Sequence, residues 1–421
     1  MTQGTGYNKF MLLWSGELIS AVGGGLTSFG LSVYVFQETG SAANMALVAL
    51  LAFLPVLLLS PLAGVLADRY DRRLLMMLGD GLSAIGPIYI LVCMMTGGAA
   101  LYQICIGVFV SAVFSSLLEP AYRATVTDLL TKEEYSKAGG MVSIAGSARY
   151  LISPLIAGLL LSVSDIRLLL IIDICTFIVT VICTGVVKQE IAGQDAQQET
   201  QQGIKPNSQD QAQSFLESFR EGWQAITGKR GVLILIILSS VMTCFMGALQ
   251  ILAEPLVLDF QSSRVLGITE TVCASGMLVS SIILGVRGLK KNFTRTLSLS
   301  LIIAGLAMVG FGLKENIYII GGFGFLFFFM LPFANNCLDY LTRTNIEAEK
   351  QGRAWGLISF LSQIGYVVAY SCAGLAADQI AQIRQVGVGR GAADVIMVSG
   401  IMLAIIAAAT YQFKEVRALE K

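Results

Sequence analysis

The stretch Gly64-Val65-Leu66-Ala67-Asp68-Arg69-Tyr70-Asp71-Arg72-Arg73 joins two long apolar segments, residues 42–66 and 74–96. Each segment is long enough to cross a bilayer as a helix, since a crossing takes about 20 predominantly apolar residues. The stretch between them carries three arginines and two aspartates. The sequence therefore predicts a pair of membrane helices joined by a charged loop.

Ten further apolar segments of similar length follow the same pattern along the chain. They cover residues 10–36, 100–122, 138–163, 166–187, 231–258, 265–288, 295–313, 316–341, 353–378 and 393–413. The composition agrees, because 55% of the residues are hydrophobic and only 13% are charged. A soluble domain carries roughly 25% charged residues. We expect a membrane protein with twelve transmembrane helices.

A polar stretch divides these segments into six before it and six after it. Residues 189–213 are rich in Gln, Asp, Glu, Ser and Asn, a composition that cannot bury a core. Phe215, Phe219, Trp223 and Ile226 follow at helical spacing and predict an amphipathic helix on the membrane surface. We expect a six-helix half over residues 1–188, a cytoplasmic linker over 189–230 and a second six-helix half over 231–421.

The distribution of Lys and Arg among the predicted loops sets the orientation. With both termini in the cytoplasm, basic residues favour the inner loops over the outer loops by roughly four to one. The first apolar segment is too long for a signal peptide and reads as a retained membrane helix. We expect a multi-pass protein of the bacterial cell membrane with cytoplasmic termini.

The composition also argues against several classes of function. The formal net charge is zero, which argues against binding of nucleic acid, since that would need a basic face. The chain has no histidine, and its eight cysteines lie in apolar runs without a CxxC pair. No GxxxxGK[ST] loop for ATP is present. We expect neither an enzyme nor a metal site or cofactor, and any proton transfer has to use carboxylates.

The charged loop resembles the signature G-x-L-a-D-r-x-G-r-[KR] of the major facilitator superfamily. The match covers Gly64, Leu66, Ala67, Asp68, Arg69, Arg72 and Arg73, and it departs at Asp71, where the pattern has Gly. Four other stretches resemble patterns of the same family: Trp14–Ser20 (W-x-G-Q-x-x-S), Glu119–Arg123 (P-A-x-x-A), Ser153-Pro154 with Gly158 (G-P-x-x-G-G of exporters) and Gly352-Arg353-Ala354 with Gly356 (G-R-x-x-g). The macrolide-efflux-like drug exporters are the branch that the chain resembles most.

The resemblance implies an all-α membrane fold of two pseudo-symmetric six-helix halves, and a gate at the charged loop. Gly64 would let two helices approach closely, Asp68 would pair with a helix end or a cation, and the arginines would clamp carboxylates. The other expected gating residues are Asp80, Glu119, Asp128, Asp339 and Arg353. The alternative is that the arginines only mark the cytoplasmic side.

Three charged residues inside the predicted helices are candidates for binding substrate or protons. Glu17 lies about 12 Å into the first helix, and Arg149 lies in the fifth helix, a neighbour of the first in this fold. The two could form a switch or a brace, and we favour the brace. Glu254 precedes Pro255 in the seventh helix, which lines the cavity in this family. For Asp173, in the sixth helix, a structural role is favoured over transport.

The leading interpretation is secondary active transport of a small molecule, with export of an amphipathic compound such as a macrolide or a siderophore driven by H⁺. We expect a monomer whose partners are its substrate, the coupling ion and the lipid bilayer. The alternative is a lipid or lysophospholipid flippase on the same fold. The acidic character of the candidate residues favours cationic or neutral substrates over anionic ones.

Overall fold

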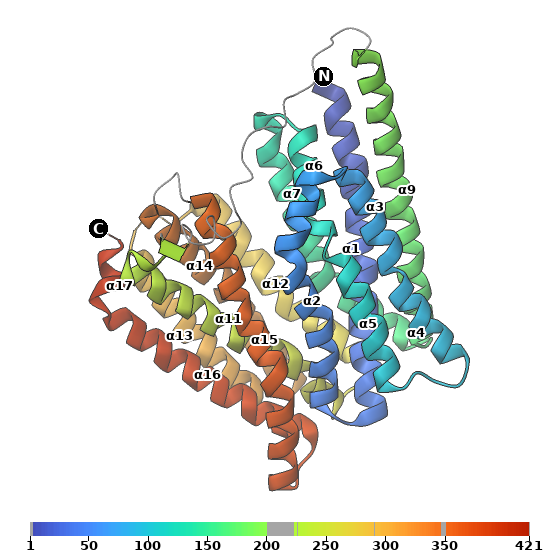
Figure 1. Cartoon of the computed structure of the whole chain (residues 1–421). Coiled ribbons are helices and arrows are strands. Elements are labelled where there is room, and N and C mark those ends of the chain that lie inside the picture. The colour runs from blue at the N-terminus through green and yellow to red at the C-terminus, as the bar shows by residue number, and fades with distance from the viewer. Residues whose placement is uncertain (1–2, 200–222, 225, 290, 347–350, 421) are drawn as a thin grey trace. The chain divides into compact units, whose positions relative to one another are not determined.

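The computed structural model describes residues 3–199, 223–224, 226–289, 291–346 and 351–420 (Figure 1). Twelve helical segments in these ranges are long and apolar enough to cross a membrane, and each overlaps one of the predicted segments. The largest difference at a segment end is in the fourth, which continues to Leu129, where the sequence predicted an end at residue 122. The prediction of an all-α membrane fold with twelve spans is confirmed.

Nine of the twelve spans are single continuous helices. Their bounds are α1 (Gln3–Thr39), α2 (Ala42–Arg69), α9 (Ile166–Glu199), α11 (Arg230–Leu258), α12 (Ser263–Arg287), α13 (Phe293–Gly312), α14 (Ile317–Asn345), α15 (Gln351–Arg384) and α16 (Val388–Gln412). A short helix, α17 (Lys414–Ala418), follows the last span. Helix α9 continues to Glu199, ten residues past the predicted start of the linker at residue 189. Most of the predicted amphipathic helix lies outside the described residues.

The other three spans are each built from two helices. They are α3 (Arg72–Ser83) with α4 (Ile85–Met95), α5 (Leu101–Ser115) with α6 (Leu118–Leu129), and α7 (Lys132–Leu151) with α8 (Ser153–Leu161). Pro87, Pro120 and Pro154 each follow a break by two or three residues. A proline removes one backbone hydrogen bond and its ring clashes with the preceding turn, so the helix is interrupted just before it.

The chain separates into two compact units. One unit holds residues 1–35 and 47–208, and the other holds 36–46 and 209–421. The turn between α1 and α2 therefore packs with the second unit, although the helices on both sides of it continue in the first (Figure 1).

In the first unit, α1 packs against α9 through three glycines at seven-residue spacing, Gly16, Gly23 and Gly30. A Cβ on Gly16 would lie 3.3 Å from the Cβ of Cys183, and one on Gly30 would lie 2.6 Å from a methyl group of Leu169. A seven-residue repeat keeps one face of a helix turned toward its neighbour. We call this contact the α1–α9 seam.

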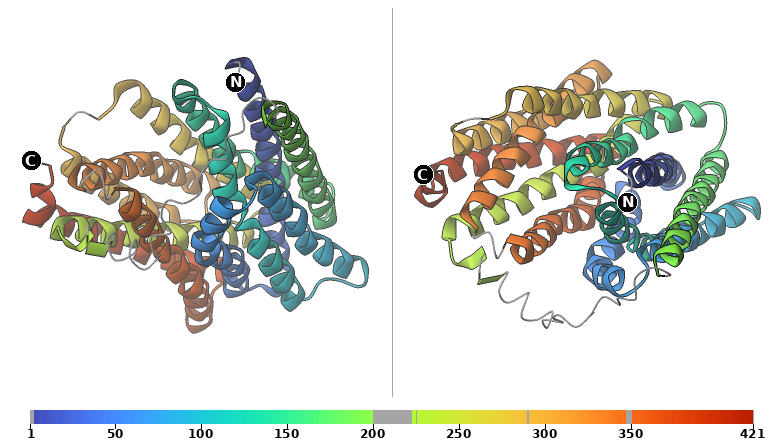
Figure 2. Two further views of the ribbon diagram at one scale, coloured as in Figure 1. Left: turned by 45° about the horizontal axis from the view of Figure 1, so that its top comes forward. Right: turned by 90° about the horizontal axis from the view of Figure 1, so that it is seen from above.

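In the second unit, α13 packs against α16 and α11 against α15, and these pairs lie side by side in Figures 1 and 2. Gly305 of α13 and Gly400 of α16 face each other, since a Cβ on either would lie 2.5 Å from the carbonyl oxygen of the other. The first and fifth spans of each unit also share a side-chain bond. Ser153 Oγ donates to the carbonyl of Val22 at 3.0 Å, and Thr243 Oγ1 donates to the carbonyl of Ser362. This repetition agrees with two related six-helix halves.

The N-terminus of α2 is capped by a carboxylate that lies far away in the sequence. Asp378 of α15 accepts hydrogen bonds from the backbone N–H of Ala42 at 2.9 Å, the N–H of Ala43 at 3.1 Å and the Ser41 hydroxyl at 2.6 Å. Gly374, one helical turn earlier, makes room, because a Cβ there would lie 2.5 Å from the Ala42 carbonyl oxygen. Asp378 thus holds the turn between α1 and α2 within the second unit.

We expect Asp378→Ala to destabilise this turn by about 2 kcal/mol, because it removes a charged cap from three donors. Limited proteolysis at residues 36–46 measures the effect, and the variant should be cut faster than the wild type. Asp378→Asn keeps one acceptor oxygen, so its cleavage rate should fall between those of the wild type and Asp378→Ala. Equal cleavage of all three proteins would contradict the assigned cap.

Candidate functional site

The loop after α2 ends at Asp71, which caps the N-terminus of α3. Its Oδ1 accepts hydrogen bonds from the N–H of Arg73 at 2.9 Å and of Leu74 at 3.4 Å, while its Oδ2 pairs with Lys188 Nζ of α9 at 3.5 Å. A carboxylate at this position also suits the positive end of the helix dipole. Asp71 stands where the family pattern has glycine, and capping gives that departure a structural reason.

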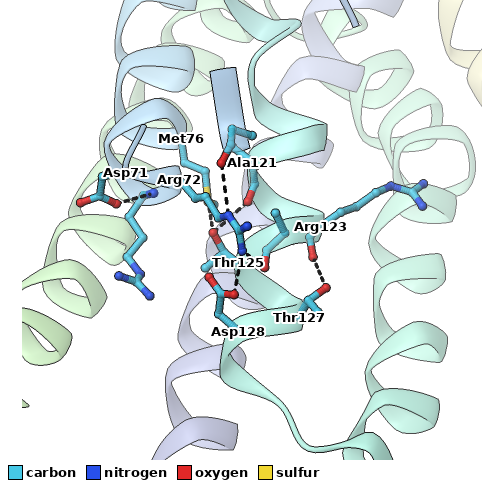
Figure 3. Close-up of polar contacts among 11 residues, drawn as sticks. Asp71, Arg72, Met76, Ala121, Arg123, Thr125, Thr127 and Asp128 are labelled. Carbon is cyan, nitrogen blue, oxygen red and sulfur yellow. Dashed lines mark hydrogen bonds and ion pairs between the residues drawn. The ribbon is translucent and has the colours of Figure 1, made fainter. Parts of the chain in front are cut away.

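Arg72 ties the start of α3 to the C-terminal ends of two other helices (Figure 3). Its Nη1 lies 2.7 Å from Asp128 Oδ1 and donates to the Ala124 carbonyl at 3.2 Å, both on α6. Its Nε donates to the Ala67 carbonyl of α2 at 3.2 Å. A guanidinium is well placed here, because the last carbonyls of a helix carry its negative dipole end. The structure thus brings together two of the predicted gating residues, Arg72 and Asp128.

A double-mutant cycle on Arg72 and Asp128 should show a coupling energy of about 1 kcal/mol. The pair is partly shielded, with side chains 31% and 42% exposed, so its coupling should lie at the upper end of the surface range. Thermal unfolding of Arg72→Ala, Asp128→Ala and the double variant measures it.

The matched control is the cycle on Arg123 and Glu119, an i,i+4 pair at 2.7 Å on α6 with side chains 72% and 68% exposed. Its coupling should stay below about 0.5 kcal/mol. Equal coupling energies in the two cycles would contradict a stabilising ion pair between Arg72 and Asp128.

Other predicted gating contacts are not made in the described part of the chain. Asp80 is 1% exposed, neither of its carboxylate oxygens has a hydrogen-bond partner there, and no ion pair joins it to Arg69, Arg72 or Arg73. It faces the buried side of α3, whereas Arg69 is exposed. Glu119 pairs with Arg123 on its own helix and not with the loop.

The remaining gating residues are Gly64, Asp68, Asp339 and Arg353. Asp339 pairs with Arg343 one turn later on α14 at 2.9 Å. No described atom lies within 4 Å of a Cβ built on Gly64, so the close helix approach expected there is not observed. The side chains of Asp68 and Arg353 lie outside the described residues.

Glu17 and Arg149 lie near each other in the first unit. Glu17 is half-buried on α1, and Arg149 is on α7 within electrostatic range of it. No ion pair between them occurs among the described side chains, so the predicted brace is absent in this conformation. Glu119 also acts electrostatically on Glu17 and adds a second negative charge to its surroundings.

The residues of the exporter-like motif in the fifth span hold α8 against α1. Pro154 occupies the first turn of α8, where its missing N–H costs nothing. Ser153 is fully buried and donates to the Val22 carbonyl at 3.0 Å, and a Cβ on Gly25 would lie 2.6 Å from the Ser153 Cβ. Gly158 is buried one turn further on. This motif therefore fixes the crossing of the first and fifth spans.

Glu254 lies beside a second glutamate in the second unit. Glu254 is four residues before the end of α11, and Glu270 is seven residues into α12, so both lie about 6–11 Å from the adjoining ends of the two helices. Glu254 is the charged group that acts on Glu270, and both side chains are half-buried. Two adjacent carboxylates in a membrane can share one proton or attract a cation.

Sequence reasoning missed Glu270 and Asp378. Glu270 lies inside the predicted span 265–288, and a lone acid inside an apolar span is itself a signal of function. Asp378 lies at the end of the predicted span 353–378, where an acidic residue is unremarkable. Only its three donors from residues 41–43 reveal its role.

Comparison with known proteins adds a family and several relatives. Residues 13–370 match the family model described as Major Facilitator Superfamily. The chain is 23% identical to Macrolide efflux protein A of Streptococcus pyogenes over 422 residues, which cover 98% of this chain and 97% of that protein. It is 26% identical to the multidrug efflux pump Tap of Mycolicibacterium fortuitum over 159 residues, or 36% and 38% of the two chains.

Solved transporter structures share the fold. The structure of the nucleoside transporter NupG gives a TM-score of 0.74 at 12% identity and covers 97% of this chain and all of NupG. An inward-facing bacterial homologue of the iron transporter ferroportin gives 0.72 at 13% identity, with 97% and 99% covered. At such identities the likeness concerns the fold and not the substrate.

Proposed function

The chain belongs to the major facilitator superfamily, and we propose that it is a secondary active exporter that expels an amphipathic small molecule in exchange for protons. The membership makes it a multi-pass membrane transporter. Our proposal adds the direction of transport, the class of substrate and the identity of the coupling ion. We also propose that it acts as a monomer in the cell membrane, with both termini in the cytoplasm.

Export of a macrolide-like compound is supported by the similarity to Macrolide efflux protein A, which extends over nearly the whole of both chains. The half-buried acids Glu17, Glu254 and Glu270 support the same substrate class. They give the membrane interior a negative character, which attracts an amphipathic cation or tolerates a neutral molecule. An anionic substrate would meet repulsion at each of the three.

The single observation that carries proton coupling is Glu17, a carboxylate inside a membrane span. A guanidinium lies in electrostatic range of it, but no described side chain forms an ion pair with it. Such a carboxylate can exist with or without a proton. When it is ionised, Glu17 is drawn to Arg149 of α7. When it is protonated, that attraction is lost and α1 is free to move relative to α7. Proton binding therefore changes which helix arrangement is favoured, as alternating access requires.

Proteoliposomes loaded with a pH-sensitive dye test this function. A macrolide, a cationic dye and a catecholate siderophore are added separately, and internal pH is followed with and without a Na⁺ gradient. We expect proton movement that starts when one of the first two compounds is added. Proton movement with none of them would overturn the proposed coupling. Movement of a fluorescent lysophospholipid between leaflets would favour a flippase.

A further inference from the structure

A line of polar side chains runs along the face of α9 that is turned toward α1. Asp173, Thr176, Thr180 and Thr184 follow one another at intervals of three or four residues and therefore share one helix face. They are 1%, 9%, 2% and 0% exposed, although they lie inside an apolar span. Threonines are common where membrane helices pack closely, so the feature that needs an explanation is the buried acid, and intramembrane acids are by default functional.

Asp173 lacks a hydrogen-bond partner on one of its oxygens. The hydroxyls of Thr27 on α1 and Thr176 on α9 flank its carboxylate. Thr176 Oγ1 is engaged with the backbone carbonyl of Asp173 at 2.7 Å. Thr27 Oγ1 and Asp173 Oδ1 are both buried at this contact, yet neither atom makes a hydrogen bond of good geometry with any described residue. Buried polar atoms of this kind require an explanation, and the binding of a proton or an ion is one of the ordinary explanations.

The packing of Gly23 limits what that ligand can be. A Cβ on Gly23 would overlap Thr176 Oγ1 and lie 2.9 Å from Asp173 Oδ1, so α1 closes directly over the carboxylate. A metal cation needs a shell of oxygen ligands at 2 Å or more, and the seam has no room for one. A proton needs no such space and turns the carboxylate into a neutral donor.

The charges around Asp173 favour the same ligand. Arg149 of α7 and Asp80 of α3 interact electrostatically with Asp173, and Glu17 of α1 acts in turn on Asp80. No ion pair joins Asp173 or Asp80 to Arg149 in the described part of the chain. Arg149 acts on Asp173 and on Glu17, whereas the charged groups that act on Asp80 are the two carboxylates Glu17 and Asp173. Three carboxylates that interact in this way cannot all be ionised inside a membrane with one guanidinium nearby.

We propose that Asp173, flanked by Thr27 and Thr176, is a proton-binding site in the α1–α9 seam, separate from Glu17. The bound proton keeps the seam closed. A neutral carboxyl can lie against Gly23, whereas a charged one would have no cation in contact among the described residues. Glu17 lies ten residues before Thr27 on the same helix, or about 15 Å away. Loss of the Asp173 proton would loosen α1 and so affect Glu17, a role in coupling that rests on the proposed function.

Infrared spectroscopy of the purified protein tests the site without substrate or transport, so it can succeed even if the proposed export fails. The wild type minus Asp173→Asn spectrum should show the C=O stretch of one protonated carboxyl, and this signal should disappear as the pH is raised. Asp173→Asn is isosteric and mimics the neutral form, so it should fold. The signal should persist in Glu17→Gln, which separates the two sites.

Two matched pairs of variants locate the carboxyl. Thr27→Val should shift the frequency of the signal, whereas Thr184→Val, on the same face of α9 and 0% exposed, should leave it in place. Gly23→Ala should also shift it, while no described atom lies within 4 Å of a Cβ on Gly24, so Gly24→Ala should not. The proposal is overturned if the difference spectrum shows no protonated carboxyl, if the signal is independent of pH, or if the members of each pair behave alike.

Discussion

Replacing Glu17 with glutamine is expected to abolish substrate-driven proton movement and to leave the protein folded. Glutamine has the shape of the protonated glutamate, so α1 can adopt the protonated arrangement but cannot release a proton. The attraction that Arg149 exerts on the ionised carboxylate is lost as well. We expect a fall of at least tenfold in the initial rate of internal pH change in proteoliposomes.

The control for this prediction is Asp165→Asn, which removes an acid from the loop before α9. Asp165 is 60% exposed and pairs loosely with Arg167 at 3.6 Å, so its loss should change the rate by less than about twofold. Binding of a neutral macrolide, measured by equilibrium dialysis, should survive in Glu17→Gln, since a neutral compound does not depend on the charge of this carboxylate. Proton movement at the wild-type rate in Glu17→Gln would exclude Glu17 as the coupling residue.

Replacing Gly365 with alanine is expected to destabilise the packing of α11 against α15 in the second unit. A Cβ there would overlap the Ser240 carbonyl oxygen and Thr243 Oγ1, and would lie 2.6 Å from the backbone nitrogen of Cys244. Two of these atoms belong to the backbone of α11, so the clash is relieved only by moving α11 away from α15. Overpacking of this kind costs about 3 kcal/mol or more. This is a large part of the total stability of a folded protein.

The same helix supplies the matched control, Gly356→Ala. Gly356 is exposed on α15, and no described atom lies within 4 Å of a Cβ built there. Alanine at an open helical position should be neutral or stabilising by about 0.5–1 kcal/mol. Thermal unfolding and the yield of monodisperse protein in detergent compare the two variants. Similar behaviour would show that α11 and α15 do not depend on the close approach at Gly365.

The positions of the spans could be predicted from the sequence because membrane insertion is decided locally. A run of about 20 apolar residues is sufficient, whatever lies elsewhere in the chain. The breaks near Ala84, Leu117 and Ile152 were not predicted, although the prolines that cause them are visible. A proline only sometimes breaks a helix, as the continuous helices through Pro55 and Pro332 show.

The candidate site was predicted less completely. The clamp between Arg72 and Asp128 followed from the family motif, and the structure places these side chains 2.7 Å apart. Asp80 was expected in the same clamp but makes no ion pair with the loop arginines in the described part of the chain. The expectation failed because of how α3 is rotated about its own axis, which places Asp80 on the buried face of the helix. A rotation of this kind depends on all the neighbours of the helix and cannot be predicted from the local sequence.

The sequence by itself determined the class of protein, the number of spans and the family, because hydropathy and a loop motif are properties of short segments. Only the tertiary structure decided which polar groups meet. Asp378 reaches Ser41 across 337 residues, and Glu254 of α11 acts electrostatically on Glu270 of α12. Asp173 lies against Gly23 because glycines let α1 and α9 touch. Contacts between helices are set by close packing, and packing depends on residues that are far apart in the chain.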